Sequence, residues 1–172
     1  MVCFFPHGFL QSSRRGCAAI LAFAVLFGIL LGGICAGLAE PMLFQLMRTA
    51  ALSCVSIVCL LQVILLPILF TAFAVYLGQY WLVILVAFSK AFLFGYFCSG
   101  ILLQYPNSGF LFAFLFLNSD FLSLPVLCWC WFRSIRSREA GLQTIIPAVF
   151  LFIGIAFLNY QVVSPFLASL LS

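Results

Sequence analysis

The feature that most constrains this chain is a run of 23 residues without a charged side chain, residues 17–39. About 20 mostly apolar residues suffice for an α-helix to cross the hydrocarbon core of a bilayer. Arg14 and Arg15 precede the run, and Glu40 follows it. The run is longer than the roughly 7–15 apolar residues of a secretory signal. We therefore expect a membrane-spanning helix here rather than a cleaved leader.

Four further apolar runs follow, and few charges separate them. Only 6% of the 172 residues are charged, against about 25% in a soluble domain. Ten charged side chains are too few to cover a soluble globule of this size. The expected fold class is all-α, with one integral membrane domain over residues 1–172 that forms a polytopic helical bundle. Its five spans are predicted at residues 17–39, 49–76, 82–103, 110–132 and 141–160.

The sequence is less decisive about the local structure of two segments. The run 49–76 contains Pro67, which favours one kinked helix, with two shorter helices as the alternative. Residues 162–171 are apolar but too short to cross a bilayer. Ser164 and Pro165 match an N-cap followed by the first residue of a helix. A short C-terminal helix lying in the membrane interface is expected there.

The basic residues orient the predicted spans, because cytoplasmic loops carry an excess of Lys and Arg. With the N-terminus in the cytoplasm and the C-terminus outside, five arginines lie inside and Arg48 lies outside. Membrane lipid is then the expected surrounding. The net charge of +4 is scattered rather than arranged in a stripe, so nucleic acid is not an expected partner. The five inside residues are Arg14, Arg15, Arg133, Arg136 and Arg138.

Lys90 and Asp120 are the two charges that fall inside predicted spans. They lie on the two arms of a predicted hairpin whose turn is near Asn107, at depths that differ by roughly 4–5 Å. Since charged residues within the membrane usually pair, an intramembrane ion pair that holds the hairpin is one interpretation. Lys90 reaching to the cytoplasmic interface is a second. A proton or ion path through the pair is a third.

The first span carries two G-x-x-x-G patterns, Gly28 with Gly32 and Gly33 with Gly37. Small residues at this spacing let helix backbones approach closely. The contact can form within the chain or with a partner, a homo-oligomer included. Gly95 in the third span is a further packing candidate.

Enzyme signatures do not occur in the sequence. The chain has eight cysteines and a single histidine, His7. Seven of the cysteines lie in or beside apolar runs, where free Cys packs as a small hydrophobe. A non-enzymatic protein without cofactor or metal is therefore predicted.

The segment from Phe88 to Pro125 resembles the stage II sporulation protein M family. Lys90 followed by Gly95, then Gly109 with Phe110, then Asp120 with Pro125, are similar to motifs of that family. Residues 163–165, Val-Ser-Pro, also resemble its C-terminal motif. The chain departs from the pattern at Ala91, where the family has Gly, at Asn118, where it has Pro, and at Asp120, where it has Asn.

The resemblance implies about five spans, a short cytoplasmic N-terminus and a bacterial cell membrane. It further implies a scaffold of the engulfment complex in endospore formation, which holds the peptidoglycan-remodelling stage II sporulation proteins D and P at the septal membrane. The competing interpretation is a small membrane subunit of a transporter or channel that uses Lys90 and Asp120.

Overall fold

A computed structural model describes residues 14–38, 57–105, 107, 109, 113 and 117–163. All regular secondary structure in these ranges is helical, so the predicted all-α class is confirmed for the described part of the chain. The elements are α2 (Arg14–Leu38), α4 (Ile57–Tyr76), α5 (Tyr80–Gln104), α7 (Asn118–Arg136), α8 (Arg138–Leu158) and the short π-helix η1 (Asn159–Val163).

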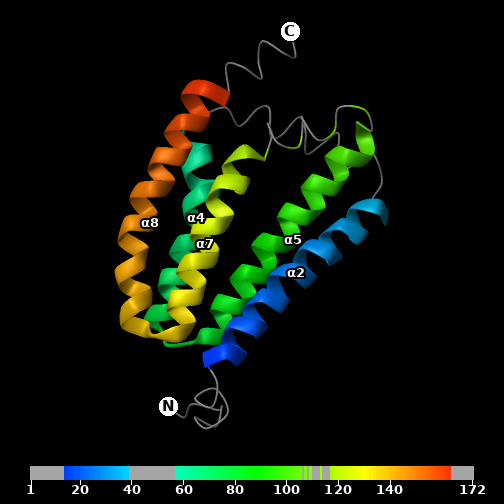
Figure 1. Cartoon of the computed structure of the whole chain (residues 1–172). Helices are drawn as coiled ribbons and strands as arrows, with labels where there is room; N and C mark the ends of the chain where they lie inside the picture. Colours follow the sequence, from blue (N-terminus) through cyan, green and yellow to red (C-terminus); the bar gives the residue numbers. More distant parts are fainter. Residues whose placement is uncertain are drawn as a thin grey trace.

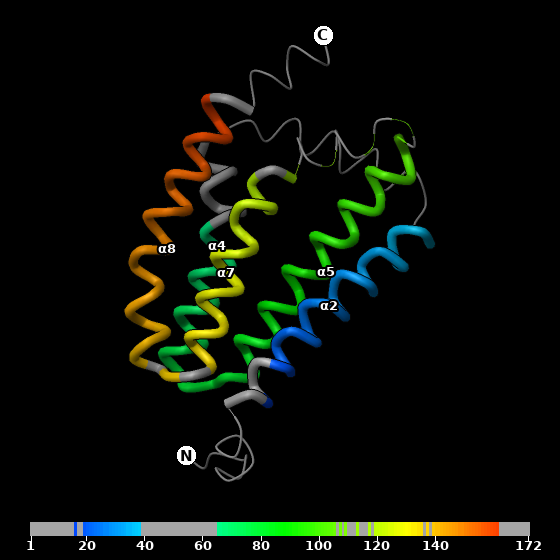
Figure 2. The backbone as a smooth tube through the Cα atoms, viewed as in Figure 1, coloured from blue at the N-terminus to red at the C-terminus, as the bar shows by residue number. Residues whose placement is uncertain are grey.

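Helices that follow one another along the chain run in opposite directions through the bundle (Figure 1). The tube view shows two groups: α4, α7 and α8 lie together on one side, and α2 and α5 on the other (Figure 2). The neighbours α2 and α5 run parallel to each other (Figure 1). Their pairing joins parts of the sequence about 60 residues apart.

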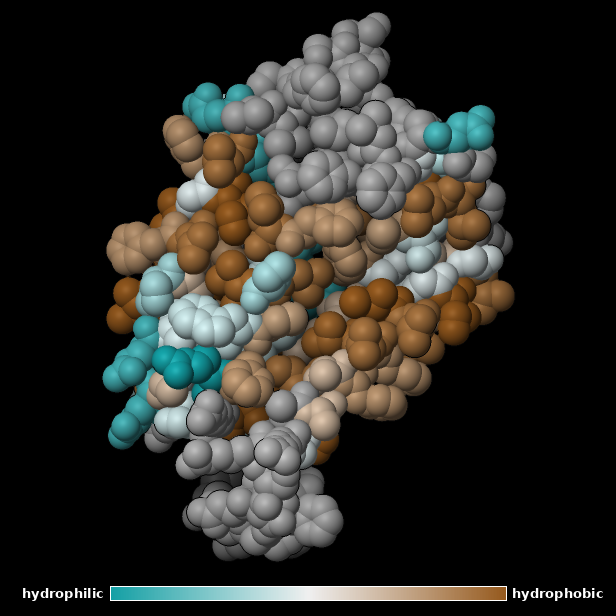
Figure 3. All heavy atoms as spheres, in the orientation of Figure 1, coloured by the Kyte–Doolittle hydropathy of each residue, from teal (hydrophilic) through white to brown (hydrophobic). Residues whose placement is uncertain are grey.

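Three helical stretches are long and apolar enough to cross a membrane: Ala19–Leu38, Tyr80–Gln104 and Glu139–Gln161. In α4 the apolar stretch Leu65–Tyr76 is shorter. Apolar side chains cover much of the visible face, while hydrophilic ones gather at the end where α7 passes into α8 (Figure 3). The chain is thus a helical membrane protein by length and composition, and the count of five spans stays a prediction.

Several boundaries differ from those expected. The expected third span, 82–103, is α5, which is one or two residues longer at each end. The fourth was expected to begin at residue 110, yet the described helix α7 begins at Asn118. Asn118, Ser119 and Asp120 are typical of helix starts, since their polar side chains suit the first turn. The apolar character of the preceding residues concealed this start.

Two further expectations fall partly or wholly outside the described residues. The described part of the run 49–76 is a single helix, α4, which continues through Pro67; residues 49–56 are not described. The expected C-terminal helix at Ser164 and Pro165 lies outside the described residues, as does Phe110.

The core sits among α4, α7 and α8. The largest fully buried side chains there are Trp131, Phe152, Ile68 and Leu127. Leu21 of α2 and Val83 of α5 belong to the same buried cluster, so this core also joins the two helix groups. The turn between α4 and α5 is closed by Gly78, whose φ of 70° lies in the left-handed region that glycine adopts most readily.

Candidate functional site

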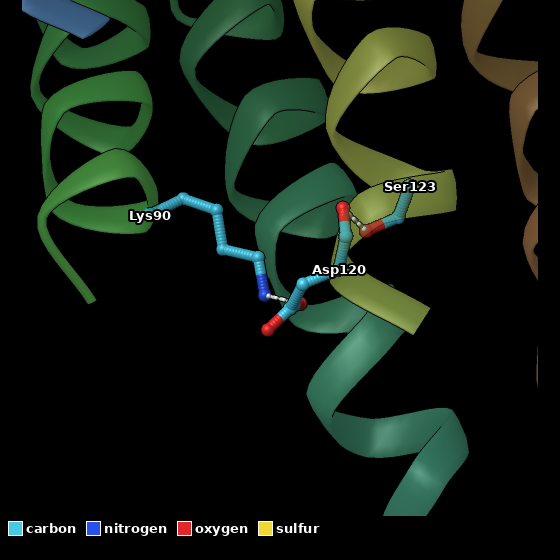
Figure 4. A network of polar contacts seen from close by, with 3 residues as sticks. All are labelled: Lys90, Asp120 and Ser123. Atoms are coloured by element: carbon cyan, nitrogen blue, oxygen red, sulfur yellow. Dashed lines mark hydrogen bonds and ion pairs between the residues drawn. The ribbon is translucent and has the colours of Figure 1, made fainter. Parts of the chain in front are cut away.

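Lys90 of α5 and Asp120 of α7 form an ion pair (Figure 4). The Lys90 Nζ lies 2.5 Å from the Asp120 Oδ1, and the side chains are only 10% and 15% exposed. The ammonium therefore contacts the carboxylate of the next described helix rather than reaching to the interface. Each charge removes much of the cost of placing the other away from water.

The start of α7 gives the carboxylate a second favourable interaction. Asp120 is the third residue after the N-cap Leu117, within the first turn. The N-terminus of a helix carries a partial positive charge, which stabilises a nearby carboxylate. Ser123 one turn later donates from Oγ to the backbone oxygen of Asp120 at 3.4 Å, as Figure 4 shows. The pair therefore joins the first turn of α7 to the middle of α5.

An aromatic contact lies beside the ion pair. Phe94, one turn after Lys90, meets Phe121 edge to face, with ring centroids 5.0 Å apart. Edge-to-face pairs add about 0.5–1.5 kcal/mol beyond the area that they bury. The contact between α5 and α7 therefore combines a charge pair with an apolar one, which suits a fixed contact between helices.

Glycines bring α2 and α5 into backbone contact. A Cβ on Gly28 would lie 2.8 Å from the Phe88 backbone oxygen, and one on Gly32 would overlap the Phe92 backbone oxygen. From the other side, a Cβ on Gly95 would overlap the Ile29 backbone. The two helices can approach this closely only because these positions carry no side chain.

The two G-x-x-x-G patterns differ in their contacts. A Cβ on Gly33 would lie 2.9 Å from the Ser99 Oγ, whereas one on Gly37 would meet nothing within 4 Å. Gly28, Gly32 and Gly95 thus pack within the chain. Gly37 faces open space.

A run of small buried residues underlies this contact. From residue 24 onward the buried residues of α2 recur every four positions, as do the buried residues of α5 from 83 to 95. The residues are Ala24, Gly28, Gly32 and Ala36 on α2, with Val83, Ala87, Ala91 and Gly95 on α5.

The arginines that orient the predicted spans gather at one end of the bundle (Figure 1). Arg14 and Arg15 begin α2, Arg133 and Arg136 lie in the last turn of α7, and Arg138 begins α8. The Nε of Arg133 is buried and has no hydrogen-bond partner among the described atoms. Basic residues from three helix ends therefore lie on one side of the membrane helices.

Sequence reasoning missed a polar contact in the core. The Trp131 Nε1 donates to the Thr71 Oγ1 at 2.9 Å, and Thr71 donates to the Pro67 backbone oxygen at 2.7 Å. A buried indole N–H requires an acceptor. A Thr at the fourth position after a helical Pro was the available signal, but it does not identify Trp131 as the donor.

The remaining predicted residues have local roles. Gly109 is buried, and a Cβ there would lie 3.0 Å from the Leu102 Cα. Pro125 lies inside α7 and is exposed. Four described cysteines are free thiols: Cys35, Cys98, Cys128 and Cys130. Within the described ranges, no three His, Cys, Asp or Glu side chains come together as metal ligands.

No family model, curated protein or solved structure matches this chain. The likeness to the stage II sporulation protein M family therefore rests on the quoted residues alone. Of these, Lys90 and Asp120 meet in space, Gly95 packs on α2, and Gly109 packs on the end of α5.

Proposed function

We propose that this chain is a non-enzymatic membrane scaffold whose intramembrane polar and small residues hold its own helices together. The ion pair carries this proposal, because Lys90 and Asp120 bind each other at 2.5 Å and are largely buried. A charge pair closed in this way fastens α5 to α7. The close contact of α2 with α5 supports the same role, since it makes a rigid platform.

The partners that we propose are the peptidoglycan-remodelling stage II sporulation proteins D and P. The residues that resemble the stage II sporulation protein M family support this choice. The scaffold would sit in a bacterial cell membrane with its N-terminus in the cytoplasm. The arginines gathered at one end of the bundle (Figure 1) support that orientation.

The second candidate is a small transporter or channel subunit, because ionisable residues within a membrane frequently mark ion or proton paths. Lys90 and Asp120 bind each other and are largely buried. Because each charge is already paired, this arrangement favours the scaffold.

Affinity purification of the tagged chain from its own host, in mild detergent during sporulation, tests the proposal. We expect peptidoglycan hydrolases to co-purify with the wild type. The variant Lys90→Arg keeps a cation beside the Asp120 carboxylate and is expected to retain them. The flux of protons or ions across vesicles that contain the purified protein is measured alongside, to test the transporter.

The two candidates give opposite outcomes in this design. If the protein is a scaffold, the wild type and the variant both capture hydrolases, and neither supports flux. A transporter gives flux that Asp120→Asn abolishes while the helices stay assembled. Absence of hydrolases from the wild-type complex would contradict the proposed partners.

A further inference from the structure

An apolar groove of about 370 Å³ lies on the outer face between α2 and α5. Phe23 stacks on Phe27, and Phe27 stacks on Phe88, with ring centroids 5.7 and 6.2 Å apart. The stacked rings give the groove a fixed wall that bridges both helices. Six of the side chains around it are Ile20, Phe23 and Phe27 of α2 and Trp81, Leu85 and Phe88 of α5.

The groove extends to the end of the bundle where the arginines gather. Trp81 is the second residue of α5, and its Nε1 donates to the Gln79 Oε1 at 2.7 Å in the exposed turn. Tryptophan at a helix end is typical of the membrane–water interface. Along α2, Arg15 precedes Ile20 by five residues, which is about 8 Å of helix. The groove itself is apolar, and the two arginines lie on α2 between the groove and the start of the helix.

We propose that this groove binds an acyl chain of an anionic phospholipid, with the phosphate headgroup at the Arg14 and Arg15 end of α2. An apolar slot of helical length suits a hydrocarbon chain, and basic residues beside membrane helices attract anionic headgroups. The two arginines at the start of α2, close in sequence to the groove residue Ile20, favour this occupant over an uncharged partner helix. The proposal depends on membrane insertion and not on the partners proposed above.

Native mass spectrometry of the full chain provides the test. The protein is reconstituted in vesicles of equal parts phosphatidylglycerol and phosphatidylcholine, extracted in mild detergent, and its bound lipids are counted. We expect the wild type to retain phosphatidylglycerol several-fold over phosphatidylcholine. Arg14→Gln with Arg15→Gln is expected to abolish that preference, because it removes the positive charge that attracts the anionic headgroup. Arg14→Lys with Arg15→Lys keeps the charge and should keep the preference.

A matched pair of substitutions tests the groove itself. Leu85 in the groove and Leu151 on α8 are both 51% exposed. Leu85→Trp fills the slot and is expected to remove the retained lipid, whereas Leu151→Trp is expected to retain it. Helix content by circular dichroism shows that each variant is folded.

Three results would overturn the proposal. Equal retention of the two lipids by the wild type would leave only non-selective surrounding lipid. Full retention by folded Leu85→Trp would place the lipid elsewhere. A wild-type dimer without bound lipid would show that a second copy of the chain, not a lipid, occupies the groove. A missing hydrolase partner, by contrast, would leave the lipid result unchanged.

Discussion

Lys90 lies in the apolar helix α5 and Asp120 in the first turn of α7, and the two carry opposite charges away from water. Their ion pair is 2.5 Å long and mostly buried. Removing one partner leaves the other buried and uncompensated, whereas replacing both removes the problem. The pair is therefore expected to behave as a unit in stability measurements.

Lys90→Met alone is expected to lower the free energy of unfolding by about 2–4 kcal/mol, because the Asp120 carboxylate loses its partner. Asp120→Asn should have an effect of similar sign. The double variant should be less destabilised than the sum of the two single variants, with a coupling energy of about 1–3 kcal/mol. The free energy of unfolding is measured in mixed micelles for the wild type, the two single variants and the double variant. Strictly additive effects would contradict an ion pair that stabilises the fold.

Thr71→Val is expected to lower stability by about 1 kcal/mol, because it leaves the buried Trp131 N–H without its acceptor. In a Trp131→Phe background the same change should cost much less. Ser89 is the control, since it makes a similar bond to the Leu85 backbone oxygen but is exposed. Ser89→Ala should change the unfolding free energy by less than about 0.5 kcal/mol.

At the scale of the helices, the contact between α2 and α5 depends on the close approach of their two backbones. The facing sides of both helices carry small buried residues every four positions. In the two parallel helices Gly28 faces Phe88 and Gly32 faces Phe92, so each glycine lies one turn beyond the last. A side chain on this line must push the helices apart.

Gly32→Ala is expected to destabilise the protein by about 1–3 kcal/mol, because its methyl group would overlap the Phe92 backbone oxygen. Gly37→Ala is the matched control within the same helix, since a Cβ there meets nothing within 4 Å. Ala is the better helix former, so this variant should be neutral or up to about 1 kcal/mol more stable. Equal effects at both positions would refute the observed register.

On the scale of the whole molecule, alternating helix directions bring the α4–α5 turn and the α7–α8 junction to one end of the bundle (Figure 1). The arginines at the start of α2 and around the α7–α8 junction lie at this same end. Asn107, just after α5, belongs to the other end. By the positive-inside rule, we propose that the arginine-rich end is the cytoplasmic one.

Single cysteines in a cysteine-free background test this topology. Gln79→Cys and Glu139→Cys are expected to react with a membrane-impermeant thiol reagent only after the cytoplasmic side is opened. Asn107→Cys is expected to react in intact cells. All three positions are exposed, so the reagent can reach them. Labelling of Gln79→Cys and Asn107→Cys from the same side would contradict the alternating arrangement.

The helices themselves were largely predictable. The run at 82–103 became α5 with small shifts at its ends, because a long apolar run without Pro leaves the backbone little choice but a helix. The start of α7 was not predictable in the same way. Residues 110–117 are entirely apolar and the apolar character continues into α7, so hydropathy alone does not place the start of that helix.

The amino-acid sequence by itself determined the helical class, the membrane-compatible runs and the candidacy of Lys90 and Asp120. These properties depend on the burial of apolar groups and on the cost of burying charge. Both follow from the order of residues along the chain. Only the tertiary structure decided that Gly32 packs while Gly37 does not, and that Trp131 reaches Thr71. It also decided that α2 and α5 share an apolar groove. Those outcomes depend on distances between residues far apart in the chain, which helix packing sets and local composition does not.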